Sequence, residues 1–316
     1  GVVPYEMSDS FPLEALKAQT IAARTYAIRK ALSSTARDYD LSDTTNDQVY
    51  KGRSDANTRA AQAVQATAGV CAFYNGSLAM CYYGSSNGGQ TELVENQWGA
   101  GDETGYLDMR DDPYDLENPK SVVKSVTLKK PASGVDQTPY GLRALIAAEL
   151  KGELVAQGYD ASAESLRIDT ITAVSVDTPM YADPSRVYTM FHITFTYSAR
   201  TRTDPVVINS SVVSSALNDT IEVSLFTAPP DQTAAVTVTP EPTATPAPTA
   251  TPKPVYGDFE PAKNAVTLDI PIFPDAETAL GLSINQYDNE LWTVTEQNDA
   301  FLVEARRFGH GVGMSQ

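Results

Sequence analysis

The sequence predicts a single α+β domain. Helical patterns are concentrated in the first half of the chain and strand patterns in the second, as expected when helices and a mixed or antiparallel sheet share one core. A Pro-rich insertion interrupts the strand patterns. We therefore expect residues 1–228 to form the main part of the domain, 229–256 a tether, and 257–316 the C-terminal part of the same domain, truncated at its end.

The strongest helical pattern runs over residues 11–33. Pro12 suits a first helical turn, alanines fill the middle, and a stripe of small and apolar residues recurs every three or four positions. An alanine-rich run predicts a second helix over 59–68, and leucine spacing predicts a third over 141–152.

The dipeptide Asn75-Gly76, between two apolar runs, predicts a β-hairpin with a two-residue turn. This turn pairs Cys71 with Met80 and directs the sulfur atoms of Cys71 and Cys81 to opposite faces. A three-residue loop would place the two cysteines opposite each other. We favour two small apolar side chains over a disulfide.

Runs rich in β-branched and aromatic residues predict the strands of the sheet. They lie at 168–176, 188–197, 206–208, 221–226, 265–272, 290–295 and 301–308. Proline and threonine dominate 237–254, which predicts an extended, solvated tether. Such tracts are typical of bacterial proteins outside the cytoplasm, so we expect a secreted or membrane-anchored protein.

The net charge of -17 argues against a nucleic-acid partner, which would require a basic face. No apolar run approaches the ~20 residues of a membrane span. Two cysteines and two histidines, widely scattered, lack the spacing of a zinc site, and we expect no metal and no other cofactor. The chain starts without Met and ends in a Gly-rich turn, so we interpret it as a fragment whose targeting signals lie elsewhere.

Residues 12–27, PLEALKAQTIAARTYA, resemble the signature of the stage II sporulation protein D family, which includes the amidase enhancers of vegetative walls. Other segments resemble the family's further elements and follow in its order: 1–7, 47–52, 82–92, 98–99, 106–107 and 309–316. The region 120–302 resembles it only loosely, and the Pro-rich tether is not expected of the family. Gly84 stands where many members have histidine, which leaves the role of that histidine open.

The resemblance implies a peptidoglycan lytic transglycosylase, a lyase acting in sporulation or cell-wall remodelling. Such an enzyme cleaves the bond between N-acetylmuramic acid (MurNAc) and N-acetylglucosamine (GlcNAc) and leaves 1,6-anhydroMurNAc. One carboxyl group suffices for this reaction, because the sugar's own 6-hydroxyl group is the nucleophile. The resemblance also implies that the substrate is glycan stripped of stem peptides and that a cell-wall amidase is the partner.

Glu14 is the expected acid/base residue, and Glu6 is its rival. A lone glutamate in a first helical turn is more often a partner of the helix dipole, but here it lies within the family signature. Isoleucines on the same arc of the helix would raise the pKa of Glu14 by desolvation. Lys17 and Arg24 share this arc and would lower it, so we expect them to face the substrate instead.

The candidates for substrate binding come from the matching motifs. They are Lys17, Gln19, Arg24, Tyr26, Gln48, Tyr50, Ser85, Ser86, Gly88, Gly89, Thr91, His310, Ser315 and Gln316. Tyr26 and Tyr50 could stack on sugar rings or simply fill the core. His310 lies between two glycines, which favours a functional loop, whereas His192 lies in a predicted strand and is structural or at the surface.

Two other functions remain open. A non-catalytic glycan-binding module that enhances an amidase would share every motif but would not need a protonated carboxyl group. If Glu6 and Glu14 shared one cleft, a two-carboxylate hydrolase would also be possible, and it would leave reducing sugar ends.

Overall fold

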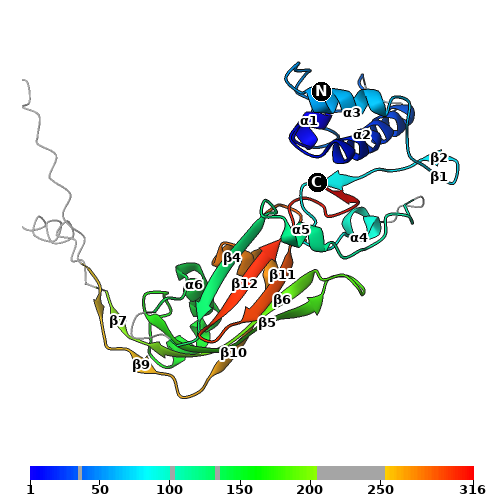
Figure 1. Ribbon diagram of the computed structural model, residues 1–316. Helices are drawn as coiled ribbons and strands as arrows, with labels where there is room; N and C mark the ends of the chain where they lie inside the picture. The colour runs from blue at the N-terminus through cyan, green and yellow to red at the C-terminus, as the bar shows by residue number, and fades with distance from the viewer. Residues whose placement is uncertain (35–37, 100–103, 132–135, 205–252) are drawn as a thin grey trace, which may run out of the picture.

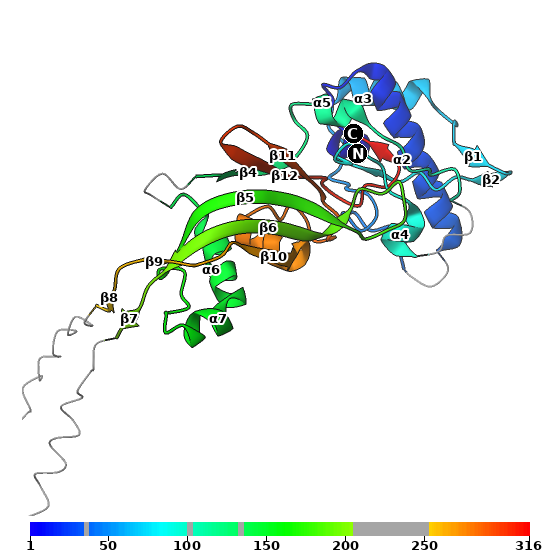
Figure 2. The same cartoon turned by 90° about the horizontal axis from the view of Figure 1, so that it is seen from below.

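The computed structural model describes residues 1–34, 38–99, 104–131, 136–204 and 253–316. Two lobes are visible (Figure 1): among the described residues, those of 1–122 and 308–316 form a helical lobe, and those of 123–307 form a sheet lobe. Both termini lie in the helical lobe (Figure 1 and Figure 2). The chain contains both helices and strands, which confirms the predicted α+β class.

The helical lobe is built around α2 (Leu13–Ser33), which begins directly after Pro12 and carries Leu16 at 0% exposure. The short α1 (Val3–Glu6) precedes it, and α3 (Thr58–Ala66) packs against it through small alanines. The predicted first and second helices are therefore confirmed.

The predicted hairpin is confirmed as β1 (Phe73–Tyr74) and β2 (Ser77–Leu78), antiparallel and joined by two residues. Asn75 and Gly76 both have positive φ, as a tight turn of this type requires. Cys71 and Cys81, which flank the two strands, are free thiols.

The first and last parts of the chain meet in a small parallel sheet. Strand β3 (Tyr83–Gly84) pairs with β13 (Met314–Ser315), and the Gln316 amide donates to the Gly84 carbonyl at 3.0 Å. Two short helices follow β3 in the chain, α4 (Val94–Trp98) and α5 (Pro113–Glu117).

The sheet lobe contains two antiparallel sheets. The first has the order β10-β6-β5, with β9 also on β6, and the second has the order β11-β12-β4. The bounds are β4 Val123–Lys129, β5 Leu166–Pro179, β6 Tyr188–Ala199, β9 Glu260–Pro261, β10 Val266–Pro271, β11 Leu291–Glu296 and β12 Ala300–Arg306. The long β5 and β6 run side by side along the lobe (Figure 2).

Five of the predicted strands are confirmed as β5, β6, β10, β11 and β12. The strands expected at 206–208 and 221–226, and most of the expected tether, fall outside the described residues. Strand β4 was not predicted. The expected third helix is present as two helices, α6 (Tyr140–Glu149) and α7 (Lys151–Ala156), which meet at Leu150.

The core of the sheet lobe lies where the two sheets and α6 meet. Phe191 of β6 and Trp292 of β11 are 0% and 1% exposed, and their ring centroids lie 6.1 Å apart. The π-helical turn η1 (Ile272–Ala276) and α9 (Glu277–Leu280) complete this core. It anchors the strand β12, which leads into the closing motif of the helical lobe.

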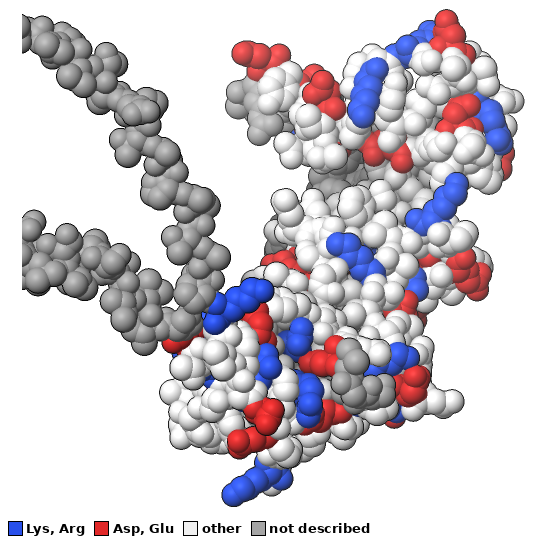
Figure 3. Space-filling view, turned by 90° about the vertical axis from the view of Figure 1, so that its left-hand side faces the viewer, with Lys and Arg blue, Asp and Glu red and all other residues white. Residues whose placement is uncertain are grey.

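The two-stranded ribbon of β7 (Arg202–Thr203) and β8 (Val255–Tyr256) joins the chain on either side of the Pro-rich segment. The described residues on the two sides of this segment therefore lie next to each other. Among the described residues, no helix combines the length and apolar character needed to cross a membrane. On the face shown in Figure 3, acidic and basic side chains are interspersed.

Candidate functional site

An open groove of about 460 Å³ lies in the helical lobe. We call it the Glu6 groove; its lining residues are Glu6, Met7, Ser8, Ser10, Phe11, Pro12, Ser85, Asn118, Lys120 and Gln316. These residues come from the α1–α2 connection, the Ser/Gly-rich loop after β3, the segment after α5 and the closing motif. The fold thus brings three expected site residues, Glu6, Ser85 and Gln316, to one groove.

Glu6 is the last residue of α1, and its side chain is partly buried. Its Oε1 accepts a hydrogen bond from the Val49 amide at 2.7 Å. Burial raises the pKa of Glu6, and the bond from Val49 only partly offsets this effect. Glu6 therefore holds its proton to a higher pH than an ordinary glutamate does.

Glu14 lies outside the lining of the groove. Its side chain is 82% exposed, and Lys17 Nζ donates to its Oε1 at 2.7 Å. The expectation that Lys17 faces the substrate rather than Glu14 is wrong, because residues three apart on a helix are neighbours and here pair in solvent. The expected desolvation of Glu14 by isoleucines is also absent, since this carboxylate lies in water.

Arg24, which was expected to face the substrate, donates hydrogen bonds within the protein. Its Nη1 donates to the carbonyls of Thr67 at 2.7 Å and Val70 at 2.9 Å, beyond the end of α3. A cation at this end of a helix satisfies carbonyl groups that have no partner within the helix. The guanidinium thus fastens α2 to α3.

Gln19 and Gln316 connect α2 to the groove. Gln19 is fully buried, and its Oε1 accepts a hydrogen bond from Gln316 Nε2 at 3.0 Å. Gln48 is also buried, and its Nε2 donates to the Ala23 carbonyl at 2.9 Å. Of these three candidates, only Gln316 lines the groove, and Gln19 holds it there. Ser315 lies in β13 opposite Gly84.

The two candidate tyrosines lie away from the groove. The Tyr26 hydroxyl donates to Asp47 Oδ1 at 3.1 Å, and burial followed by the Asp47 charge raises the pKa of Tyr26. Tyr50 is 52% exposed and lines a second pocket of about 440 Å³, together with Arg24 and Gln48. The structure therefore divides the expected substrate-binding residues between two pockets.

Most of the Ser/Gly-rich loop is committed to internal contacts. Ser86 is buried and its Oγ donates to Asp115 Oδ2 at 2.8 Å, which also accepts from the Gly88 amide at 2.6 Å. A Cβ at Gly89 would lie 2.6 Å from the Leu116 side chain. Ser86, Gly88 and Gly89 are thus held by contacts within the protein, and their contact with substrate stays a prediction.

Thr91 and His310 also form hydrogen bonds within the protein. Thr91 Oγ1 donates to the Asp108 carbonyl at 3.0 Å. His310 Nδ1 accepts from the Val312 amide at 3.0 Å, and its ring lies 4.9 Å from that of Trp98. Burial lowers the pKa of His310 to about 4, so the ring is neutral at ordinary pH. Both residues were expected to bind substrate, but neither lines the Glu6 groove.

The sequence did not single out Phe11, Asn118 or Lys120 as site residues. Asn118 and Lys120 follow α5, at the edge of the region with only a loose resemblance, where no motif marked them. Within the described ranges, no group of three or more His, Cys, Asp or Glu side chains is arranged to hold a metal ion.

Comparison with known proteins agrees with the motifs. Residues 1–74 match the family described as Stage II sporulation protein. The chain is 42% identical over 141 residues to the amidase enhancer of Bacillus subtilis, covering 42% of this chain and 19% of that protein. It is 32% identical over 135 residues to stage II sporulation protein D of Bacillus subtilis, covering 38% and 39%.

A third relative is an uncharacterized protein of Brachyspira hyodysenteriae, 42% identical over 100 residues, covering 31% of this chain and 27% of that protein. The chain thus spans well under half the length of each of these relatives. The matched part contains α1, α2 and α3, and with them Glu6. Through this part, the chain is similar to the stage II sporulation protein D family.

Proposed function

We propose that the chain is a lytic transglycosylase that cleaves the MurNAc–GlcNAc bond of peptide-free peptidoglycan glycan, with Glu6 as the acid/base residue. One observation carries the proposal: among the residues that line the groove, Glu6 is the one carboxyl group, and its pKa is raised by burial. A conventional glycosidase needs two carboxyl groups, whereas anhydro-sugar formation needs one.

The proposed reaction uses the same carboxyl group twice. Protonated Glu6 donates its proton to the glycosidic oxygen, and the bond from this oxygen to C1 of MurNAc breaks, which releases the GlcNAc hydroxyl group. The resulting carboxylate then takes the proton of the MurNAc 6-hydroxyl group as its oxygen bonds to C1. Glu6 ends protonated, and no water is consumed.

The rest of the groove has the composition expected for a sugar site. Phe11 offers an apolar ring on which a sugar face can pack. Serine hydroxyls and the amides of Asn118 and Gln316 can hydrogen-bond to hydroxyl and acetamido groups. We assign the role to Glu6 rather than Glu14, because Glu14 is outside the groove and already bonded to Lys17.

The similarity to the amidase enhancer favours a second function. In it, the groove binds glycan without cleaving it and places a cell-wall amidase on its substrate. Either function would operate outside the cytoplasm, at the cell wall or forespore envelope, during sporulation or wall remodelling.

The test is digestion of amidase-stripped peptidoglycan by the full-length protein, with products analysed by mass spectrometry. We expect 1,6-anhydroMurNAc ends with the wild type and with Glu14→Gln, and none with Glu6→Gln. Loss of product in Glu14→Gln alone would move the role to Glu14. Products heavier by one water would indicate a hydrolase. Glycan binding without products would favour the enhancer function.

A further inference from the structure

Lys120 is the one cation among the residues that line the Glu6 groove. It lies on the segment that follows α5 and is exposed. Within the described part of the chain, its ammonium group takes part in no ion pair, although Lys17, Lys30, Lys129 and Lys130 each pair with a carboxylate. This charge is thus available to a ligand.

The backbone that carries Lys120 is fixed by a hydrogen-bonded turn. The Lys120 amide donates to Asn118 Oδ1 at 3.0 Å, and the Ser121 amide donates to the Asn118 carbonyl at 2.9 Å. Ser121 Oγ in turn donates to buried Asp115 at 3.0 Å and lies 3.1 Å from Ser86 Oγ. Only the lysine side chain has to become ordered when a ligand binds, which limits the entropic cost of binding.

Lys120 and Glu6 line the same groove without forming an ion pair with each other. If they did, Lys120 would favour the charged form of Glu6 and compete with any anionic ligand. Instead, the groove contains the Glu6 carboxyl group, which can hold a proton, and separately the Lys120 ammonium group, which has no ion-pair partner among the described residues. This arrangement fits a ligand that carries a glycosidic oxygen and a negative charge on the same sugar.

The identity of the ligand that Lys120 binds rests on the proposed function. Of the two sugars in the glycan, only MurNAc carries a carboxyl group, at the end of its lactyl side chain. In intact peptidoglycan an amide bond to the stem peptide removes this charge, and removal of the peptide restores it. We propose that Lys120 binds the free lactyl carboxylate of the MurNAc held beside Glu6, and is thereby the residue that selects peptide-free glycan.

Peptide-free glycan would then be selected by the charge of a single group on the sugar held in the groove. An ammonium–carboxylate hydrogen bond is stronger than a bond to a neutral amide, and it also orients the sugar relative to Glu6. A stem peptide would remove the charge at the point of contact and place its first residue against the lysine. The groove thus distinguishes a MurNAc with a free lactyl carboxylate from one that carries a stem peptide, at the sugar whose bond is cleaved.

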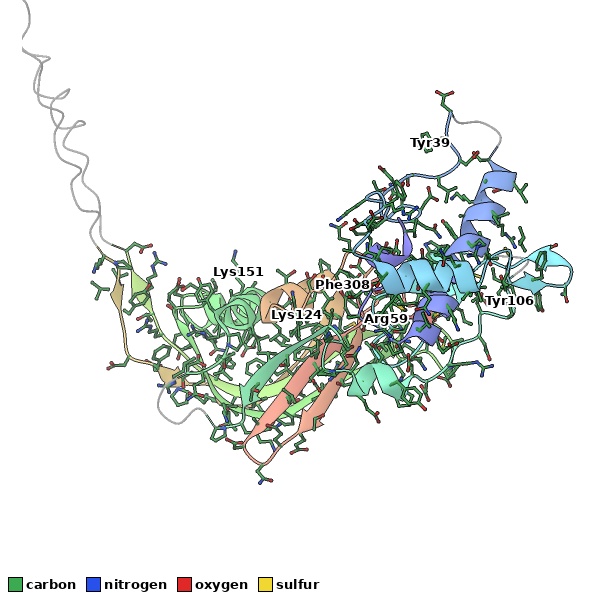
Figure 4. The ribbon with its side chains drawn as sticks, turned by 45° about the horizontal axis from the view of Figure 1, so that its top comes forward. Tyr39, Arg59, Tyr106, Lys124, Lys151 and Phe308 are labelled. Atoms are coloured by element: carbon green, nitrogen blue, oxygen red, sulfur yellow. The ribbon has the colours of Figure 1, made fainter. Side chains whose placement is uncertain are left out.

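The experiment uses the full-length protein and two forms of peptide-free glycan, one with free lactyl carboxyl groups and one with these converted to N-methylamides. We expect wild type to prefer the free acid by about tenfold in kcat/KM. Lys120→Met should lose this preference through a slower reaction of the free acid, and Lys120→Arg should retain most of it. Lys151→Met is the control, since Lys151 is exposed on the sheet lobe away from the helical lobe (Figure 4).

Two results would overturn the role of Lys120: equal rates of wild type on both glycans, or an unchanged preference in Lys120→Met. If wild type cleaves neither glycan, the proposed function fails, and equilibrium binding of the two glycans then tests Lys120 separately. Tighter binding of the free acid that disappears in Lys120→Met would support the lysine even so. Equal binding of both glycans would exclude it.

Discussion

Arg307 and Glu92 form an ion pair in which neither side chain is exposed to solvent, with Nη1 3.4 Å from Oε2. The guanidinium also donates to the carbonyls of Asn87, Gln90 and Asn289. Asn87 and Gln90 belong to the Ser/Gly-rich loop, and Asn289 belongs to the sheet lobe. A single buried side chain therefore holds together the loop beside the groove, the closing motif and the larger lobe.

Replacement of Arg307 by Met should unfold the protein at markedly lower urea concentration. It leaves Glu92 buried without its partner, which costs about 3–5 kcal/mol in comparable cases. Arg110→Met is the control, because the side chains of Arg110 and Asp108 pair while 77% and 61% exposed, and loss of this pair should cost about 1 kcal/mol or less. Equal losses in the two variants would show that the buried pair is not important for stability.

Gly311→Ala should destabilise the protein more than Gly309→Ala. Both glycines have positive φ, so either alanine adds backbone strain of about 1–2 kcal/mol. A Cβ at Gly311 would also lie 2.8 Å from Arg307 Nε, whereas a Cβ at Gly309 would meet nothing within 4 Å. The overpacking should add about 1–3 kcal/mol in a urea denaturation experiment. Equal costs would contradict this explanation.

Glycan cleavage should slow as pH rises through the raised pKa of Glu6. Burial favours the protonated acid, and in the proposed reaction this is the form that donates to the leaving oxygen. The profile of kcat/KM against pH measures this titration with peptide-free glycan as substrate. Glu14→Gln should leave the profile in place, and a shift of the profile in that variant would argue against Glu6.

The stability of the sheet lobe should fall as pH rises through about 7. Burial, and then repulsion from Glu290 and Asp288, raises the pKa of Glu277 from the usual 4.5 to about 7. The folded state therefore binds this proton more tightly than the unfolded state does. The resulting stability is complete below pH 4.5 and is lost as pH rises through 7.

Thermal unfolding of Glu277→Gln between pH 4 and pH 9 tests this prediction. The variant should match the wild type at low pH and exceed it at high pH by up to about 3 kcal/mol, the free energy equivalent of the shift. Glu296→Gln, at a side chain that is 68% exposed, controls for the removal of one charge. If the difference in stability between Glu277→Gln and wild type were the same at all pH values, the prediction for Glu277 would be wrong.

The elements with strong local patterns could be predicted from the sequence. The stripe that includes Leu16 gave helix α2, and Asn75-Gly76 gave the β1–β2 hairpin with its register. Strand β4 was missed because its charged and polar residues lie on exposed positions, and only Leu128 of its seven residues is buried. Strand β4 forms because it pairs with β12, which lies far along the chain.

The site was predictable only as a set of motifs. Glu6, Ser85 and Gln316, which lie in the matching motifs, line one groove, but the motifs could not tell which side chains face it. Ser86 is directed inward by Asp115, a partner 29 residues away that no local pattern identifies. Lys120 lacks a motif, and only the three-dimensional arrangement places it beside Glu6.

The parallel pairing of β3 with β13 also has a consequence for biosynthesis. Glu6 is made among the first residues of this sequence, whereas Gln316, which lines the same groove, is made some three hundred residues later. A nascent chain therefore presents Glu6 without the other side of its groove. Contacts so distant in sequence form late in folding. Any function of this groove would thus begin only after the segment up to Gln316 has been made and folded.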